Sequence, residues 1–500
     1  MRAGLLYVTV VLAGACGLVY ELALGAISTF FLGDTVTQFA TVTGIFLTAM
    51  GIGAYATRFV DDHVRAFVDC QLGAAVVGGL SVPIMYVAFA SAAELHTVMY
   101  VLVLLTGAFV GAELPLLLRV LRRRASVRSV VARALTVDYA GALVGSLAFA
   151  VVFLPRLGVL RAGVLFGVIN AASAVIGAEL LAYDPKPLRA RALVIFAVLS
   201  AAAVFAPDLV AGADEALFNE PVVYSKQSAY QRIVLTRGHS GVDLFLDGNL
   251  QFAGNDEYRY HEALVHPLFS SAPKRARVLV LGGGDGLAIR EIEKYDDVQS
   301  ITLVDLDPQM IAMARTVPDV RALNHASFGD PRVHVVNDDA MVWLHESPPM
   351  QPFDVVVVDF PDPNNFALGK LYTVRFYRLL RARLADDARI VVQSTSPLVS
   401  RRSFWCIVRS LESAGFFVRP YHALVPSFGE WGYALAAPKE FPVPDGSGPL
   451  PPGLRYVTHE TIPGLFVLAP DMSALDVKPN VLDDQTLVRY YEDEQRRFIR

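Results

Sequence analysis

Long apolar segments follow one another through the first 211 residues of this sequence. There are seven, and each is about as long as a helix that crosses a bilayer, which needs ~20 residues. The segments lie at about 5–31, 37–57, 66–92, 97–118, 135–154, 162–183 and 191–207. Helices of a large soluble core would carry a polar stripe, and a stretch such as VLVLLTGAFVGAELPLLL has almost none. We therefore expect residues 1–211 to form an α-helical multi-pass domain of about seven spans that contacts the lipid bilayer.

The loops between these segments indicate which way the spans run. Lysine and arginine gather after the second, fourth and sixth segments, whereas the loops at 32–36 and 93–96 have neither. The positive-inside rule then places the N-terminus and the basic loops in the cytoplasm. Seven crossings would put the second half of the chain outside, and one segment that does not cross would keep it inside. The sequence does not decide on which side of the membrane the second half of the chain lies.

Three carboxylates lie at or near membrane depth: Glu21, Glu113 and Asp138. A charged group in the bilayer is costly, so such residues are functional candidates by default, here as a path for cations. The structural alternative is that each pairs with an arginine or caps a helix near the interface. Both interpretations stay open at the level of sequence.

Residues 218–500 have the composition of a soluble protein. The runs QRIVLTRG and VDLFLDGNLQFAG predict a small antiparallel sheet, followed by a helix in DEYRYHEALVHPLF, and together they form a subdomain at 218–272. Between 273 and 440, apolar strand patterns alternate with helix patterns, which indicates a mostly parallel sheet under helices. Residues 441–500 form a C-terminal extension to which the sequence assigns no role.

Charge and cysteine content argue against several classes of protein. The net charge of −5 argues against a nucleic-acid partner. Cys16, Cys70 and Cys406 are too few and too scattered for a disulfide framework or a metal site. We expect no bound metal.

The predicted parallel strands end in carboxylates. In such sheets the ligand lies beyond the carboxyl ends of the strands, and an acid about 20 residues after a glycine turn can bind a ribose. These acidic residues are Asp285, Asp305, Asp338, Asp359 and Asp362. Helix capping explains Asp338 or Asp362 singly. A rim with so many acids and hardly a lysine or arginine repels phosphates and attracts a cationic ligand.

In order and spacing, residues 222–437 resemble the polyamine aminopropyltransferases, of which spermidine synthase is the familiar member. The matching motifs are LFLDGNLQFAGNDEYRYHEALVHPL, VLVLGGGDGLAIREI, VDLDPQMI, VVNDDAMVWL and DVVVVDFPDP. The apolar first half is similar to the membrane-fused bacterial branch of that family. The resemblance implies a Rossmann-like, class I methyltransferase-type α/β domain, a location in the bacterial cell (inner) membrane, and a homo-oligomer.

The resemblance also implies the reaction and its residues. The aminopropyl group of decarboxylated S-adenosylmethionine, a co-substrate, would pass to a diamine, most often putrescine, with no further cofactor. By family match Asp359 is the proton acceptor, Tyr260 orients the amine, and Asp362 belongs to the same catalytic loop. The nucleoside would meet Gln231, Gly282, Gly284, Asp305, Asp338 and Asp339. The diamine or the aminopropyl group would meet His261, Asp285 and Asp362.

Two departures from the family pattern put the acceptor amine in question. Phe360 and Pro361 stand inside the catalytic loop, where the familiar enzymes have small polar residues, and Phe428 replaces a late tyrosine. Two other functions compete with aminopropyl transfer. One is methyl transfer from S-adenosylmethionine, although Asp285 would repel the carboxylate of that donor. The other is a membrane polyamine sensor or transporter whose synthase-like domain is not catalytic.

Overall fold

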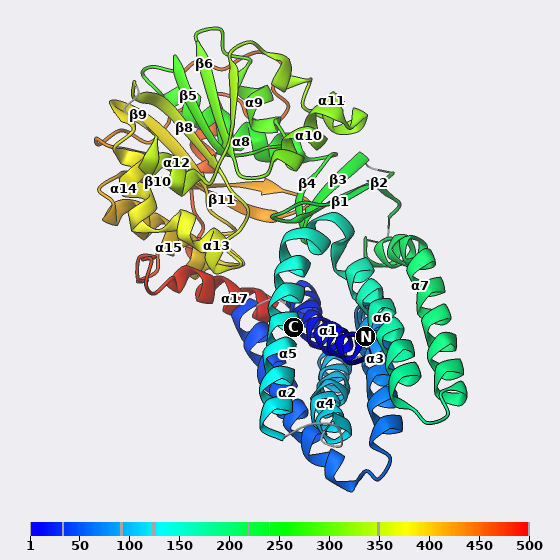
Figure 1. The fold of residues 1–500 in the computed structure, drawn as a ribbon. Coiled ribbons are helices and arrows are strands. Elements are labelled where there is room, and N and C mark those ends of the chain that lie inside the picture. Colours follow the sequence, from blue (N-terminus) through cyan, green and yellow to red (C-terminus); the bar gives the residue numbers. More distant parts are fainter. Residues whose placement is uncertain are drawn as a thin grey trace. The chain divides into compact units, whose positions relative to one another are not determined.

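The computed structural model describes residues 2–32, 35–90, 94–121, 127–218, 220–239, 241–347 and 351–498. The chain forms two compact units, Met1–Ala229 and Tyr230–Arg500. The first is mainly helical, and the second is built on a large sheet (Figure 1). Most of the arginine-rich loop after the fourth apolar segment, residues 122–126, lies outside the described residues.

Long helices in the described part of the first unit follow the apolar segments. They are α1 (Arg2–Leu32), α2 (Thr35–Ala56), α3 (His63–Ala90), α4 (Leu95–Leu121), α5 (Val127–Ala148), α6 (Leu154–Leu181) and α7 (Lys186–Phe218). Among the described residues, six helical segments are long and apolar enough to cross a membrane. The expected multi-pass helical domain is thereby confirmed.

The count is six because the segments expected at 135–154 and 162–183 join. A π-helical turn, Phe149–Phe153, connects α5 to α6, and the joined segment Val131–Leu181 is 51 residues long. A straight helix of that length would measure about 76 Å, more than twice the ~30 Å of a hydrocarbon core. At Gly158 the backbone leaves the helical region, with φ 75°, so the segment is not one straight rod.

The three carboxylates expected at membrane depth, Glu21, Glu113 and Asp138, lie inside helices rather than at their ends. The Thr43 hydroxyl donates to Glu21 at 2.7 Å, and Asp138 lies beside Gly14. Glu113 is 4% exposed, and its Oε1 has no hydrogen-bond partner within the described ranges. No arginine pairs with these three residues in the described part of the chain, so the structural alternative of ion pairing is not observed. A cation path through them stays a prediction.

A four-stranded sheet precedes the large one. Its strands are β1 (Val222–Gln227), β2 (Arg232–Gly238), β3 (Gly241–Leu246) and β4 (Asn249–Ala253), in that order. The expected strand run VDLFLDGNLQFAG splits into β3 and β4 because Asp247 and Gly248 both adopt positive φ, 48° and 81°. An Asp-Gly pair with positive φ at both positions forms the tight turn that suits the twist of a hairpin.

The large sheet has seven strands in the order β10-β11-β9-β8-β5-β6-β7. They are β5 (Arg277–Gly282), β6 (Ser300–Asp305), β7 (Val333–Asn337), β8 (Phe353–Asp359), β9 (Leu384–Gln393), β10 (Phe417–Val425) and β11 (Gly429–Ala437). Strands β5 to β9 pair in parallel, and β10 and β11 add an antiparallel edge. The α/β domain expected from the alternating patterns, with a small antiparallel sheet before it, is confirmed.

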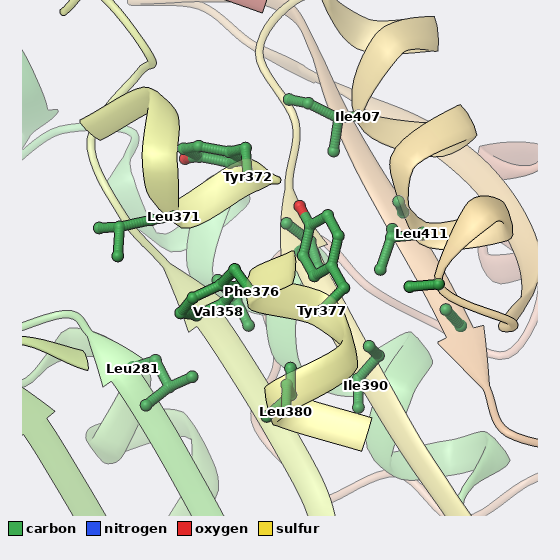
Figure 2. Close-up of a cluster of buried hydrophobic side chains, with 14 of the residues drawn as sticks. Leu281, Val358, Leu371, Tyr372, Phe376, Tyr377, Leu380, Ile390, Ile407 and Leu411 are labelled. Atoms are coloured by element: carbon green, nitrogen blue, oxygen red, sulfur yellow. The ribbon is translucent and has the colours of Figure 1, made fainter. Parts of the chain in front are cut away.

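Helices cover both faces of this sheet. They are α8 (Glu257–Ser271), α9 (Leu287–Ile292), α10 (Pro308–Thr316), α11 (Pro318–Leu323), α12 (Ala340–Glu346), α13 (Phe366–Gly369), α14 (Val374–Arg381) and α15 (Arg401–Ser413), followed by α16 (Ile462–Leu465) and α17 (Thr486–Phe498). Leu281 and Val358 face α14, as Figure 2 shows, whereas Val280 and Val357 face the core that contains α8. Alternate residues of one strand therefore enter opposite cores, which explains the continuous valine runs.

Candidate active site

Parallel pairing aligns the strand ends that carry the predicted site residues. Gly282 at the end of β5 pairs with Asp359 at the end of β8. On the other side of β5, Asp305 ends β6 and pairs with Asn337 of β7. The carboxyl edge of the sheet therefore brings together residues that lie up to about 80 positions apart in the sequence.

The glycine turn after β5 lets two carboxylate residues approach the backbone. Gly282 has φ 79°, and a Cβ there would overlap the Asp359 carbonyl. The Gly283 amide donates to that same carbonyl at 3.1 Å. At Gly284 a Cβ would lie 2.7 Å from Asp305 Oδ2. Larger residues would displace Asp305 or Asp359, which is the physical reason for glycine at these positions.

Tyr260 and Asp359 form the shortest contact of the predicted catalytic set. Tyr260 lies on α8 and is buried, and its hydroxyl donates to Asp359 Oδ1 at 2.6 Å. Burial, with repulsion from Asp285, raises the pKa of Asp359 to about 6, against the opposing effects of His261 and Tyr260. A carboxylate with such a pKa is ionised at neutral pH and still basic enough to accept a proton.

His261 and Asp285 belong to a buried network of charged groups. His261 Nδ1 contacts Glu257 Oε2 at 2.9 Å, and the Arg290 guanidinium donates to both Glu257 oxygens at 2.8 and 2.9 Å. Burial lowers the pKa of His261, but Glu257, Asp285 and Asp359 outweigh it and raise that pKa to about 8. Asp285 itself accepts from the Leu287 amide at 2.8 Å, and its pKa is raised by burial.

Sequence reasoning missed Glu257 and Arg290, the two residues that hold this network together. Both are buried, with 3% and 6% exposure. Glu257 precedes His261 by one helical turn, a spacing that places both on one face of α8 and that the sequence does contain. No local pattern links Glu257 to Arg290, because they lie 33 residues apart.

The residues predicted to bind the nucleoside have different surroundings in the structure. Asp305 is half-buried at the strand end, and burial raises its pKa to about 6. Asp339 instead caps α12 by accepting from the Met341 amide, and it pairs with Lys370 at 2.5 Å. Its neighbour Asp338 accepts from the Asp339 amide at 2.8 Å.

Gln231 Nε2 donates to Asp307 Oδ2 at 3.2 Å, and Asp307 caps α10. Helix capping is therefore not the role of Asp338 or Asp362, because Asp339 caps α12 and Asn365 caps α13.

Asp362, the last predicted site residue, has its own partners. Gln393 Nε2 donates to Asp362 Oδ1 at 3.2 Å and to the Tyr372 hydroxyl at 2.9 Å. The Tyr491 hydroxyl, from the C-terminal extension, donates to Asp362 Oδ2 at 2.7 Å. Burial raises the pKa of Asp362 to about 6 although both donors favour its ionised form.

The departures from the family pattern have structural explanations. Phe360 is buried against Tyr372 and Phe376, with ring centroids 6.3 and 5.8 Å away, so it packs the loop into the core. Phe428 lies against Trp431 with centroids 4.9 Å apart, and Tyr260 is 6.1 Å from Phe428.

The nearby carboxylate Glu430 is not part of this aromatic cluster. It contacts His422 Nδ1 at 2.7 Å across the hairpin of β10 and β11, which identifies it as one half of a local pair. Within the described ranges, no group of three or more His, Cys, Asp or Glu side chains is arranged to hold a metal ion.

The assembled edge suits a cationic ligand. Asp285 lies in the glycine turn, Asp359 and Asp305 approach it, and His261 and Arg290 supply opposing positive charges. A phosphate would meet carboxylates here, whereas an ammonium or sulfonium group would be attracted.

Comparison with known proteins identifies relatives of this chain. Residues 257–443 match the spermine/spermidine synthase domain family. A polyamine aminopropyltransferase of Leptospira interrogans is 41% identical over 498 residues, which cover 99% of each chain. Polyamine aminopropyltransferase 2 of Ralstonia nicotianae is 46% identical over 508 residues and also covers 99% of each chain. Among solved structures, spermidine synthase from Thermotoga maritima is 27% identical, with a TM-score of 0.44, and covers 50% of this chain and 85% of its own.

The similarity to the curated relatives includes the apolar first half as well as the catalytic unit. The enzymatic interpretation is therefore favoured over methyl transfer and over a domain that only binds polyamines. Decarboxylated S-adenosylmethionine and an amine are the substrates that this similarity implies. The chain belongs to the polyamine aminopropyltransferase family.

Proposed function

We propose that this aminopropyltransferase uses putrescine as its acceptor and Asp359 as its proton acceptor, and so makes spermidine and methylthioadenosine. The observation that carries the proposal is the 2.6 Å hydrogen bond from Tyr260 to Asp359, at a sheet edge otherwise rich in carboxylates. The pKa of about 6 at Asp359 suits a base that works near neutral pH.

The reaction is a displacement at the methylene carbon next to the sulfonium. The amine nitrogen forms a bond to that carbon, the carbon–sulfur bond breaks, and sulfur keeps the electron pair. An ammonium has no free pair and cannot attack, so the nucleophile must first lose a proton to Asp359. The protein supplies the base and aligns the reacting atoms. Proton acceptance by a positioned base typically increases the reaction rate ~10²–10⁴-fold.

Charge and shape around Asp359 favour a diamine. Asp359 ends β8 and Asp362 lies three residues later in the loop that follows, so two carboxylates are available for two nitrogen centres. The cluster of Tyr260, Phe428 and Trp431 offers aromatic rings to a short alkyl chain and to its cationic end. A dication with a short hydrocarbon spacer satisfies both features.

Product analysis on the full-length protein purified in detergent tests the proposal. The enzyme is given decarboxylated S-adenosylmethionine with putrescine, cadaverine, 1,3-diaminopropane or spermidine, and both methylthioadenosine and the new polyamine are measured. We expect the highest kcat/KM with putrescine and a loss of ~10²–10⁴-fold in Asp359→Asn, with donor binding retained. Preference for another amine, or full activity in Asp359→Asn, would refute the corresponding half of the proposal.

We further propose that the helical unit lies in the bacterial inner membrane and that the enzyme is a homo-oligomer. The apolar α-helices support the location, because proteins that span the outer membrane are β-barrels. Membrane fractionation tests the location, and light scattering of the detergent-purified protein tests the oligomer.

A further inference from the structure

The C-terminal helix reaches the loop that carries the predicted catalytic residues. Tyr491 of α17 donates to Asp362 Oδ2 at 2.7 Å, across 129 residues of sequence. Tyr491 lies outside residues 257–443, the part that matches the synthase domain family. The extension at 441–500, to which the sequence assigned no role, therefore contributes a side chain at the catalytic loop.

One face of α17 holds Tyr491 in place. Leu487 and Val488 are buried one turn before it, and Glu494 is buried one turn after it. Glu494 accepts from the Ser403 amide at 3.2 Å and from the Ser403 hydroxyl at 2.8 Å, at the start of α15. Spacings of three and four residues place these side chains on one helix face, so Tyr491 approaches Asp362 from a docked helix.

The chain before α17 fixes the other end of the same loop. Asn480 is fully buried, its side chain donates to the Gly369 carbonyl at 2.8 Å, and its own carbonyl accepts from the Val374 amide at 2.9 Å. A Cβ at Gly369 would lie 2.5 Å from Val488. The stretch from Asp362 to Val374 is thus tied to the extension at both ends.

Among the described residues, the partners of Asp362 are neutral hydrogen-bond donors. Tyr491 of α17 and Gln393 of β9 each donate to one carboxylate oxygen, and Tyr372 lies behind Gln393. Within the described part of the chain, no lysine, arginine or histidine contributes to the pKa of Asp362. A half-buried carboxylate that is held by neutral donors retains an unbalanced charge, which an ammonium group would neutralise.

We propose that Tyr491 is a positioning residue for the acceptor amine. Its hydroxyl orients the Asp362 carboxylate so that the lone pairs left free on the two carboxylate oxygens face the ammonium of the substrate. The inference rests on the proposed function, because it takes Asp362 as a ligand of the amine. It makes the C-terminal extension part of the acceptor site and gives α17 a role in amine affinity.

Tyr491→Phe removes the hydroxyl and keeps the ring. The matched control is Tyr490→Phe, on the same helix, because the Tyr490 ring contacts Arg402 instead of the catalytic loop. For wild type and both variants we would measure kcat and KM for putrescine, the pH dependence of kcat/KM, and putrescine binding by calorimetry with methylthioadenosine bound. The same measurements on Asp362→Asn and on the Asp362→Asn/Tyr491→Phe double variant complete a cycle.

We expect Tyr491→Phe to raise KM and Kd for putrescine about 10-fold, equal to ~1.4 kcal/mol, with kcat changed much less. Loss of the donor disfavours the ionised carboxylate, so the acidic limb of kcat/KM moves to higher pH. Tyr490→Phe should match wild type, and Tyr491→Phe should add nothing in the Asp362→Asn background, because both changes act on one interaction.

Three outcomes would decide the matter. Equal putrescine affinity in Tyr491→Phe and Tyr490→Phe would overturn the inference, and so would fully additive losses in the double variant. If wild type binds putrescine more tightly than Tyr491→Phe but forms no methylthioadenosine, the inference stands and the proposed function fails.

Discussion

Replacing Tyr260 with phenylalanine removes one hydrogen bond from Asp359 and leaves the ring in place. The Tyr260 hydroxyl donates to Asp359 Oδ1 at 2.6 Å. Burial raises the pKa of Asp359 to about 6, and this hydrogen bond opposes the rise because it favours the ionised form. Without it we expect the pKa of Asp359 to move further upward.

The size of that movement follows from the strength of the lost interaction. A hydrogen bond to a charged group contributes ~1.5–3 kcal/mol net, and ~1.4 kcal/mol corresponds to one pKa unit. Asp359 is only half-buried, so water replaces part of the lost donor and the lower end of the range applies. The pKa of Asp359 would then rise from about 6 to about 7. Because the base acts only when ionised, the ionised fraction at pH 6 would fall from about one half to about one tenth.

The assay is kcat/KM for putrescine, measured by methylthioadenosine release at saturating donor between about pH 5 and pH 9. We expect the lower ionised fraction of Asp359 to reduce kcat/KM of Tyr260→Phe about fivefold at pH 6. At pH 9 Asp359 is ionised in both proteins, so only a loss that does not depend on pH should remain. Tyr258→Phe, on the same helix, is the control, because the Tyr258 ring contacts Arg455 and not Asp359. A loss of equal size at every pH would show that Tyr260 only orients the amine, and the reasoning about the pKa of Asp359 would be refuted.

Two further changes test the structure that supports the site. Glu257→Gln removes one of the two buried carboxylates that pair with Arg290 and leaves Glu291 as the other, so we expect a loss near the lower end of ~3–5 kcal/mol in the free energy of unfolding, seen as a lower Tm; an unchanged Tm would contradict the role assigned to the Glu257–Arg290 pair. Gly284→Ala places a methyl group 2.7 Å from Asp305 Oδ2, so calorimetry should show at least ~10-fold weaker binding of methylthioadenosine with little change in Tm. Gly329→Ala is the control for that variant because a Cβ there meets nothing within 4 Å, and equal affinities of the two variants would argue against donor contact at Asp305.

The buried network behind the site explains how several carboxylates can lie close together. Arg290 pairs with Glu257 and Glu291. His261 interacts electrostatically with Glu257 and with the two aspartates Asp285 and Asp359. These positive groups offset part of the repulsion among the acids before any substrate binds. The cationic substrates then supply the remaining positive charge, which links substrate affinity to the ionisation of the same carboxylates.

Periodicity and composition alone were sufficient for the broad architecture. The apolar segments became helices, since any backbone polar group in lipid must be satisfied within its own segment. The valine runs became doubly buried strands, and the acids that follow them came to one edge because parallel strands share a direction. The Asp247-Gly248 turn is a local signal that the sequence contains, but the expected single run overlooked it, and the structure divides that run into two strands.

Contacts between distant residues were decided only by the tertiary structure. The Glu257–Arg290 pair, the antiparallel edge of β10 and β11 beside β9, and the hydrogen bond from Tyr491 to Asp362 join segments that no local pattern connects. The physical reason is that helix and strand preferences act over a few neighbouring residues. The partner of a buried charge is chosen by the packing of whole elements, and the energy of leaving that charge unpaired appears only once the chain has folded around it.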